Sequence, residues 1–142
     1  MSFYSIGNAL KTILDTVKAG SSILADVMNY DAPDADTGYP YACVVLKEGD
    51  EEVLDTFNNA ASYRFYIRAV DVNKDKANME QTMRQLCDEI MAELRKAGHQ
   101  TLGGIVDRVQ PFKISWGWQT QQDIPSRFFE IEIEVMKDVS TQ

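Results

Sequence analysis

The segment from Pro125 to Lys137 constrains the fold most, because apolar and acidic residues alternate strictly within it. Successive side chains of a β-strand point to opposite faces of a sheet. One face of this strand then carries the apolar residues Phe129, Ile131, Ile133 and Val135, and the other carries Glu130, Glu132 and Glu134. Glutamates roughly 6.7 Å apart repel one another and must face water or a basic partner. The alternation predicts a strand of an antiparallel sheet with one core face and one polar face.

A second alternating segment, Ser62 to Val72, has the composition of a neighbouring strand. Its apolar face is formed by Tyr63, Phe65, Ile67 and Ala69. Arg64 and Arg68 lie on its other face. If the two segments are adjacent in the sheet, these arginines stand opposite the glutamates.

Two amphipathic helices are predicted from apolar spacings of three and four residues. The first covers residues 3–18, with Gly20 placed to end it in a left-handed conformation. The second covers residues 78–97, where Asn78 and Gln81 approximate a capping box.

The remaining segments complete the order of elements. Short strands are predicted within residues 23–30 and 41–46, and a longer strand within 105–118 that is bent or bulged at Pro111. Loops are predicted at 31–40 and 119–123, an acidic turn at 47–52, and a frayed end at 139–142. The fold class is therefore α+β: a single domain over residues 1–142 with one mainly antiparallel mixed sheet, an N-terminal helix, and one long amphipathic helix packed on one face.

Composition and charge exclude several classes of protein. No apolar run is long enough to span a bilayer and the start does not resemble a signal peptide, so we expect folding in the cytoplasm and no membrane partner. In that compartment Cys43 and Cys87 are expected to be reduced core residues. The net charge of −8 removes the favourable counterion release that holds proteins on nucleic acid. Double-stranded DNA could still pass the protein without binding.

The polar residues do not form a recognisable catalytic or metal-binding set. Asp31, Asp34 and Asp36 precede Gly38, but the twelfth position of a calcium loop counted from Asp34 is Val45. His99 is the only histidine. Gly103-Gly104 lacks the residues of a phosphate loop. We therefore expect a protein that is not an enzyme and has no catalytic residues, cofactor or metal.

Aromatic residues are the better candidates for a functional surface. Trp116 and Trp118 are separated by one glycine, so they project from the same strand face in a polar stretch, and tryptophan is enriched at the centres of interfaces. Tyr39 and Tyr41 flank Pro40 and are either interface residues or anchors of the core and loop.

The order of these elements resembles the tail terminator and tail completion proteins of long-tailed, siphovirus-like bacteriophages. The features that carry the resemblance are the N-terminal helix, the segment Gly38-Tyr39-Pro40-Tyr41-Ala42-Cys43-Val44-Val45, the aromatic strand Tyr63-Arg64-Phe65-Tyr66-Ile67-Arg68, the helix after Asn78, and two long closing strands. The resemblance implies a hexameric ring in the virion tail, assembled in the host cytoplasm. Such a ring caps the tail tube, stops its polymerisation and joins it to the head connector, while double-stranded DNA passes through.

Within such a ring the acidic residues Glu48, Asp50, Glu51 and Glu52 are the candidate lining of the lumen. Two alternatives remain open. The chain could be a neck or tail-tube subunit of the same particle. It could instead be a small dimeric α+β enzyme or ligand-binding domain, with Asp107, Arg64 or His99 in a pocket between sheet and helix.

Overall fold

The computed structural model describes residues 3–20, 23–29, 39–53, 58–72, 75–96, 102, 108–121 and 124–140. Two helices and five strands follow in the order α1 (Phe3–Gly20), β1 (Asp26–Met28), β2 (Tyr41–Val53), β3 (Asn58–Val72), α2 (Lys76–Leu94), β4 (Arg108–Gln121) and β5 (Ile124–Ser140). This order confirms the predicted α+β class.

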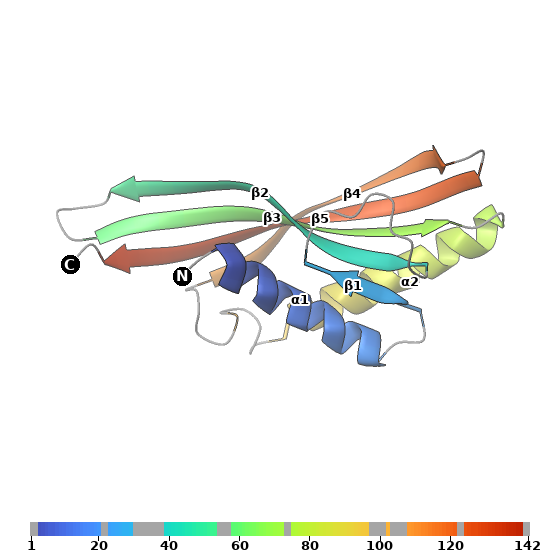
Figure 1. The fold of residues 1–142 in the computed structure, drawn as a ribbon, viewed down its shortest axis with the longest axis horizontal. Helices are drawn as coiled ribbons and strands as arrows, with labels where there is room; N and C mark the ends of the chain where they lie inside the picture. The colour runs from blue at the N-terminus through green and yellow to red at the C-terminus, as the bar shows by residue number, and fades with distance from the viewer. Residues whose placement is uncertain are drawn as a thin grey trace.

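The five strands form one mixed, mainly antiparallel sheet in the order β1-β2-β3-β5-β4 (Figure 1). Only β1 and β2 run parallel; the other three pairs are antiparallel. The two strands with the strongest alternation, β3 and β5, are neighbours at the middle of the sheet. Arg68 lies opposite Glu130, and Arg64 lies opposite Glu134, as their patterns predicted.

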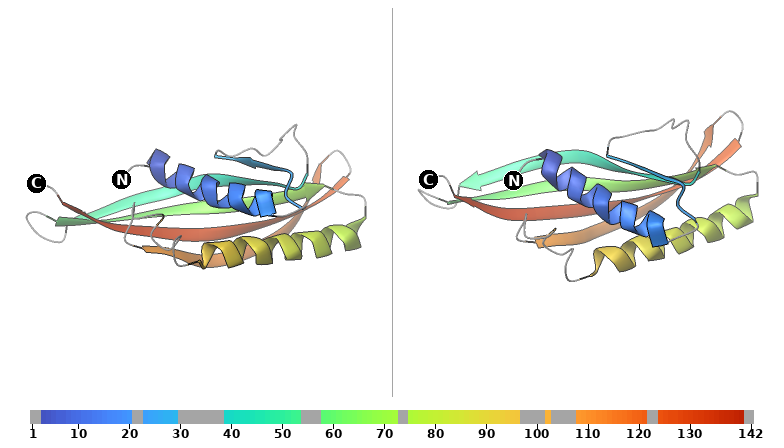
Figure 2. Two further views of the ribbon diagram at one scale, coloured as in Figure 1. Left: turned by 90° about the horizontal axis from the view of Figure 1, so that it is seen from below. Right: turned by 60° about the horizontal axis from the view of Figure 1, so that its bottom comes forward.

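Both helices cover the same face of the sheet, and the opposite face carries the charged residues (Figures 1 and 2). We call these the helix face and the open face. The core between helices and sheet is lined by Ile6, Leu10, Ile13 and Leu14 of α1, Met79, Met83, Leu86 and Ile90 of α2, and Phe65, Ile67, Phe129, Ile131, Ile133 and Val135 of the sheet. Their burial confirms both the helical spacings and the strand alternations. Neither described helix combines the length and apolar character needed to cross a membrane.

The predicted ends of the helices were partly wrong. Helix α2 begins two residues earlier than predicted, because the Asp75 side chain accepts a hydrogen bond from the backbone N–H of Asn78 at 3.1 Å and caps the first turn. Asn78 is therefore a residue of the first turn and not the cap. Gly20 is the last residue of α1, but its backbone is not left-handed.

The strands are longer than their apolar patterns indicated. The predicted acidic turn is part of β2, where four acidic residues are paired with β3: Glu48 with Arg64, Asp50 with Ser62, Glu51 with Ala61 and Glu52 with Ala60. A register shift between Leu46 and Glu48 adds one residue to β2, and the backbone pairing then continues. Whether these four residues line a lumen stays a prediction.

Similar extensions occur in β4 and β5. Strand β4 continues to Gln121, which lies within the predicted polar loop, and its register shift lies between Pro111 and Lys113, close to the predicted bulge. Val139 and Ser140, predicted to fray, are paired with β3. Consequently β2, β3 and β5 extend beyond both helices at the end of the sheet where the C-terminus lies (Figure 1).

Candidate functional site

The two tryptophans of β4 lie on the helix face at the edge of the sheet. Trp116 is opposite Phe129, and Trp118 is opposite Arg127, so both share one face as predicted. The Trp116 and Phe129 rings meet edge to face with centroids 5.1 Å apart. Ile114 lies opposite Ile131 and therefore on the same face. We call the surface formed by Ile114, Trp116 and Trp118 the aromatic edge.

The aromatic edge remains accessible although it adjoins the core. The exposed fractions are 39% for Ile114, 38% for Trp116 and 46% for Trp118. Large apolar side chains in a row on one strand are the kind of surface that binds another protein. Both tryptophans are accessible to a partner, and their role in an interface stays a prediction.

Arg127 lies against both tryptophans. Its guanidinium carbon is 4.9 Å from the Trp116 ring centroid and 4.8 Å from that of Trp118, within range of cation–π attraction. Glu80 of α2 holds the other side of the guanidinium. Arg127 Nη2 donates a hydrogen bond to Glu80 Oε1 at 3.0 Å. Arg127 Nε lies 2.7 Å from Glu80 Oε2, out of line for a hydrogen bond, and that contact acts through charge.

These contacts connect the edge strand β4 to its neighbour β5 and to helix α2. Arg84, one turn along α2, donates from Nε to Glu80 Oε1 at 2.9 Å, which is the usual contact of residues four positions apart on a helix. The indole rings are therefore supported by a charged network that includes a helix. The sequence showed the aromatic residues but gave no signal that Arg127 and Glu80, 47 positions apart, would meet.

Gly117 separates the tryptophans because the opposite face of β4 is occupied at that point. Gly117 lies opposite Phe128. A Cβ at Gly117 would come within 2.4 Å of Cζ of the Phe128 ring. The missing side chain therefore lets this ring lie across the edge strand on the open face.

Of the two tyrosines proposed for an interface, only Tyr39 is exposed. Tyr41 is fully buried and packs in a second, smaller apolar cluster with Met28, Cys43 and Val70. Its ring centroid lies 5.6 Å from that of Tyr39, which is 37% exposed. The burial of Tyr41 fits the core alternative, and Tyr39 remains the candidate interface residue of the two.

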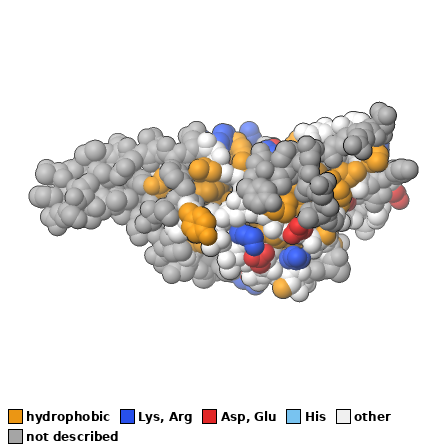
Figure 3. All heavy atoms as spheres, viewed as in Figure 1, with side chains coloured by type: hydrophobic (Ala, Val, Ile, Leu, Met, Phe, Trp, Pro, Cys, Tyr) orange, Lys and Arg blue, Asp and Glu red, His pale blue; other side chains and the backbone are white. Residues whose placement is uncertain are grey.

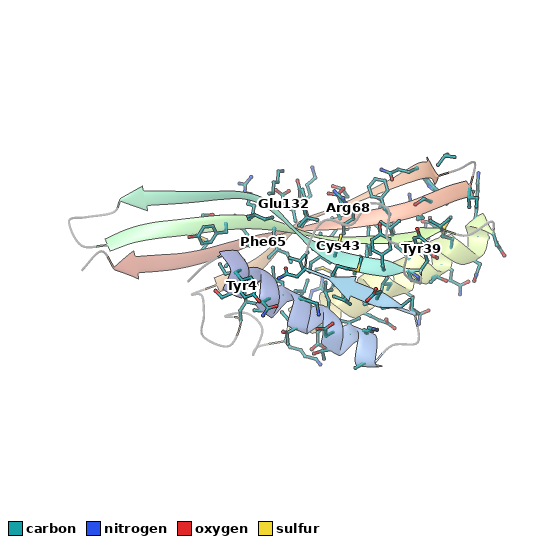
Figure 4. The ribbon with its side chains drawn as sticks, viewed as in Figure 1. Tyr4, Tyr39, Cys43, Phe65, Arg68 and Glu132 are labelled. Carbon is teal, nitrogen blue, oxygen red and sulfur yellow. The ribbon has the colours of Figure 1, made fainter. Side chains whose placement is uncertain are left out.

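The open face carries a ladder of charges across three strands. Arg68 Nε lies 3.5 Å from Glu130 Oε1. Glu132 Oε1 lies 3.4 Å from Lys47 Nζ and 3.8 Å from an Arg64 nitrogen. Arg68 and Glu132 project from the side of the sheet away from the helices (Figure 4). Glu130 and Glu132 thus face basic partners, as predicted, and Glu134 Oε1 accepts a hydrogen bond from Ser62 Oγ at 3.1 Å.

Lys47 is held as a cation at this ladder. Its Nζ lies 4.8 Å from the Tyr66 ring centroid. A hydrogen bond with the Tyr66 side chain raises the pKa of Lys47, and the carboxylate of Glu132 raises it further.

Over α1, on the described part of the surface seen in Figure 3, charges of both signs also lie close together.

Several candidate residues for chemistry lie outside the described residues: Asp31, Asp34, Asp36, His99, Gly103, Gly104 and Asp107. In the part of the chain that the structure describes, no three His, Cys, Asp or Glu side chains form a group that could hold a metal ion. Cys43 and Cys87 are both buried, which confirms their predicted place in the core. Arg64 belongs to the open face, so its predicted place between sheet and helix was wrong.

No protein-family model matches this chain, and a search of curated proteins found no match.

Proposed function

We propose that the protein is a structural subunit of a phage tail that forms a ring, caps the tail tube, stops its polymerisation and joins the tube to the head connector. The observed order of elements, with two helices on one face of a five-stranded sheet, supports this proposal. The observation that carries it is the aromatic edge. A rigid row of exposed apolar side chains on a strand at the border of the sheet suits contact with another subunit.

The contacts that hold the two tryptophan rings in place favour a role for these rings in binding another subunit. Association costs free energy because interface side chains lose freedom, and that cost is smaller for side chains that are already held in place. Arg127 lies against both rings, and Glu80 fixes Arg127. A ring repeats each contact around its circumference, so an interface that is weak between two free subunits can close on the end of a tube.

The charge distribution fits a channel for DNA. On the open face, Lys47 and Arg64 compensate Glu132, and Arg68 compensates Glu130. Glu48, Asp50, Glu51 and Glu52 lie in the part of β2 that extends beyond the helices, and they are our candidates for the lumen. Like charge would let double-stranded DNA pass without adhering.

Deletion of the gene from its phage tests the proposal. We expect overlong tails, or tails without heads, in electron micrographs. Tails of normal length joined to heads would refute it. Loss of the tube itself would indicate a tail-tube subunit, and tails of normal length that fail only to join heads would indicate a neck subunit.

Complementation of that deletion with point variants tests the surface. W118A should fold as the wild type does by circular dichroism but should fail to restore normal tails. Y4A is the matched control, because Tyr4 on α1 is 75% exposed and lies away from the aromatic edge (Figure 4). Equal complementation by both variants would show that the aromatic edge is not used.

A further inference from the structure

The sheet has two long free edges in the part of the chain that the structure describes. Strand β4 is paired only with β5. Strand β2 is paired with β3 along its length, but β1 covers its outer side only from Tyr41 to Cys43. The outer side of β2 from Val44 to Val53 is therefore the second free edge. Backbone N–H and C=O groups along such edges can pair with another chain.

Exposed apolar side chains gather on these two edges and on the same face. Four large ones lie there: Leu46 of β2 and Ile114, Trp116 and Trp118 of β4. Leu46 is 47% exposed and lies opposite the core residue Phe65, which places it on the helix face with the aromatic edge. If the two edges met, these side chains would cover one another.

The charges of the two edges are opposite. Strand β4 contains Arg108 and Lys113 and no acidic residue, so its formal charge is +2. From Val44 to Val53, β2 contains four acidic residues and one lysine, so its charge is −3. Pairing β4 with another β4, or β2 with another β2, would bring like charges together, whereas β4 with β2 brings opposite charges together.

Strand direction allows this contact without turning a copy over. Three antiparallel pairings separate β2 from β4, so these two strands run antiparallel to each other. When a second copy is placed beside the first in the same orientation, its β2 is antiparallel to the neighbouring β4. We propose that β4 of one copy pairs in this way with β2 of the next, so that the sheet continues from subunit to subunit with Leu46 against the aromatic edge.

This contact joins two different surfaces and is therefore heterologous, which generates a ring when the rotation between copies closes. The free part of β2 spans roughly 34 Å at the usual rise per residue, and the longer β4 can cover all of it. The proposal rests on the proposed function for the closure of the ring, but not for the pairing of two copies.

Cysteine cross-linking distinguishes the possible pairings. Variants L46C and I114C are prepared separately, mixed at concentrations up to the solubility limit, and treated with a short bis-maleimide reagent. We expect a cross-linked dimer in the mixture and not in either variant alone, and a ladder of higher oligomers from the double variant. Wild type is the control for the buried native thiols, and Y4C is the control for collision between exposed cysteines.

Efficient cross-linking of I114C alone would overturn the proposal, because it would show β4 against β4. So would a mixture that gives no more product than Y4C at every concentration. Comparison with the deletion phage separates this proposal from the proposed function. A cross-linked mixture with normal tails would leave the pairing intact and refute the terminator, and overlong tails without cross-linking would do the reverse.

Discussion

The contact between Glu80 and Arg127 leads to an asymmetric prediction for two variants that break the same pair. The Arg127 side chain is only 12% exposed and that of Glu80 is 22% exposed. E80A leaves the guanidinium mostly buried without its carboxylate. Removing one partner of a fully buried pair costs about 3 to 5 kcal/mol. With the remaining exposure of both groups, we expect E80A to lower the free energy of unfolding by about 2 to 4 kcal/mol.

R127M should cost less, although it removes the same contact. Glu80 would keep Arg84, whose Nε lies 2.9 Å from its Oε1, so no carboxylate is left alone. Methionine can also lie against both tryptophan rings. The expected loss is about 1 to 2 kcal/mol, mainly from the two cation–π contacts at roughly 0.5 to 1 kcal/mol each. The double variant should then be no less stable than E80A alone.

Urea denaturation followed by tryptophan fluorescence and circular dichroism measures these values. The sequence contains two tryptophans, and both lie against Arg127, so the fluorescence reports directly on this site. R84A is the control: the Arg84 side chain is 71% exposed, and its loss should cost no more than about 0.5 kcal/mol. Equal costs for E80A and R127M, or a larger cost for R127M, would refute the reasoning.

Three further predictions concern the core. L86A should lower the free energy of unfolding by about 2 to 5 kcal/mol, since Leu86 is fully buried; a loss under about 0.5 kcal/mol in chemical denaturation would contradict its place in the core. Burial raises the pKa of the Asp71 carboxyl group, so the folded protein binds a proton at Asp71 more tightly than the unfolded chain does. The free energy of unfolding should therefore fall as the pH rises from the pKa of Asp71 in the unfolded chain through its higher pKa in the folded protein. D71N should remove the fall in stability that comes from Asp71 and should stabilise the protein at neutral pH. A difference in free energy of unfolding between D71N and wild type that stays constant with pH would contradict this. Burial raises the pKa of the Cys87 thiol to about 11, so neither Cys87 nor the buried Cys43 should react with a thiol reagent at pH 8 until the chain is unfolded; rapid reaction of the folded protein would contradict their burial.

The sequence by itself determined which side chains share a face. Alternation within a strand and the spacing of a helix are local properties, because they depend only on the geometry of the backbone of that element. For this reason the apolar faces of β3, β5 and α2 were predicted correctly. The pairing of Arg68 with Glu130 could be anticipated as well, because charged side chains on the polar face of a strand need opposite charges or water.

Only the tertiary structure decided where the strands end and what lies beside them. An acidic stretch such as Glu48 to Glu52 has the composition of a solvated turn and also of a strand with polar side chains, and only its backbone pairing with β3 distinguishes the two. The burial of Tyr41 and the meeting of Arg127 with Glu80 likewise depend on which strands and helices become neighbours. The free edges of β2 and β4 exist because β1 is short and because β4 is added outside β5. Such contacts join residues far apart in the chain, and no local pattern of residues encodes them.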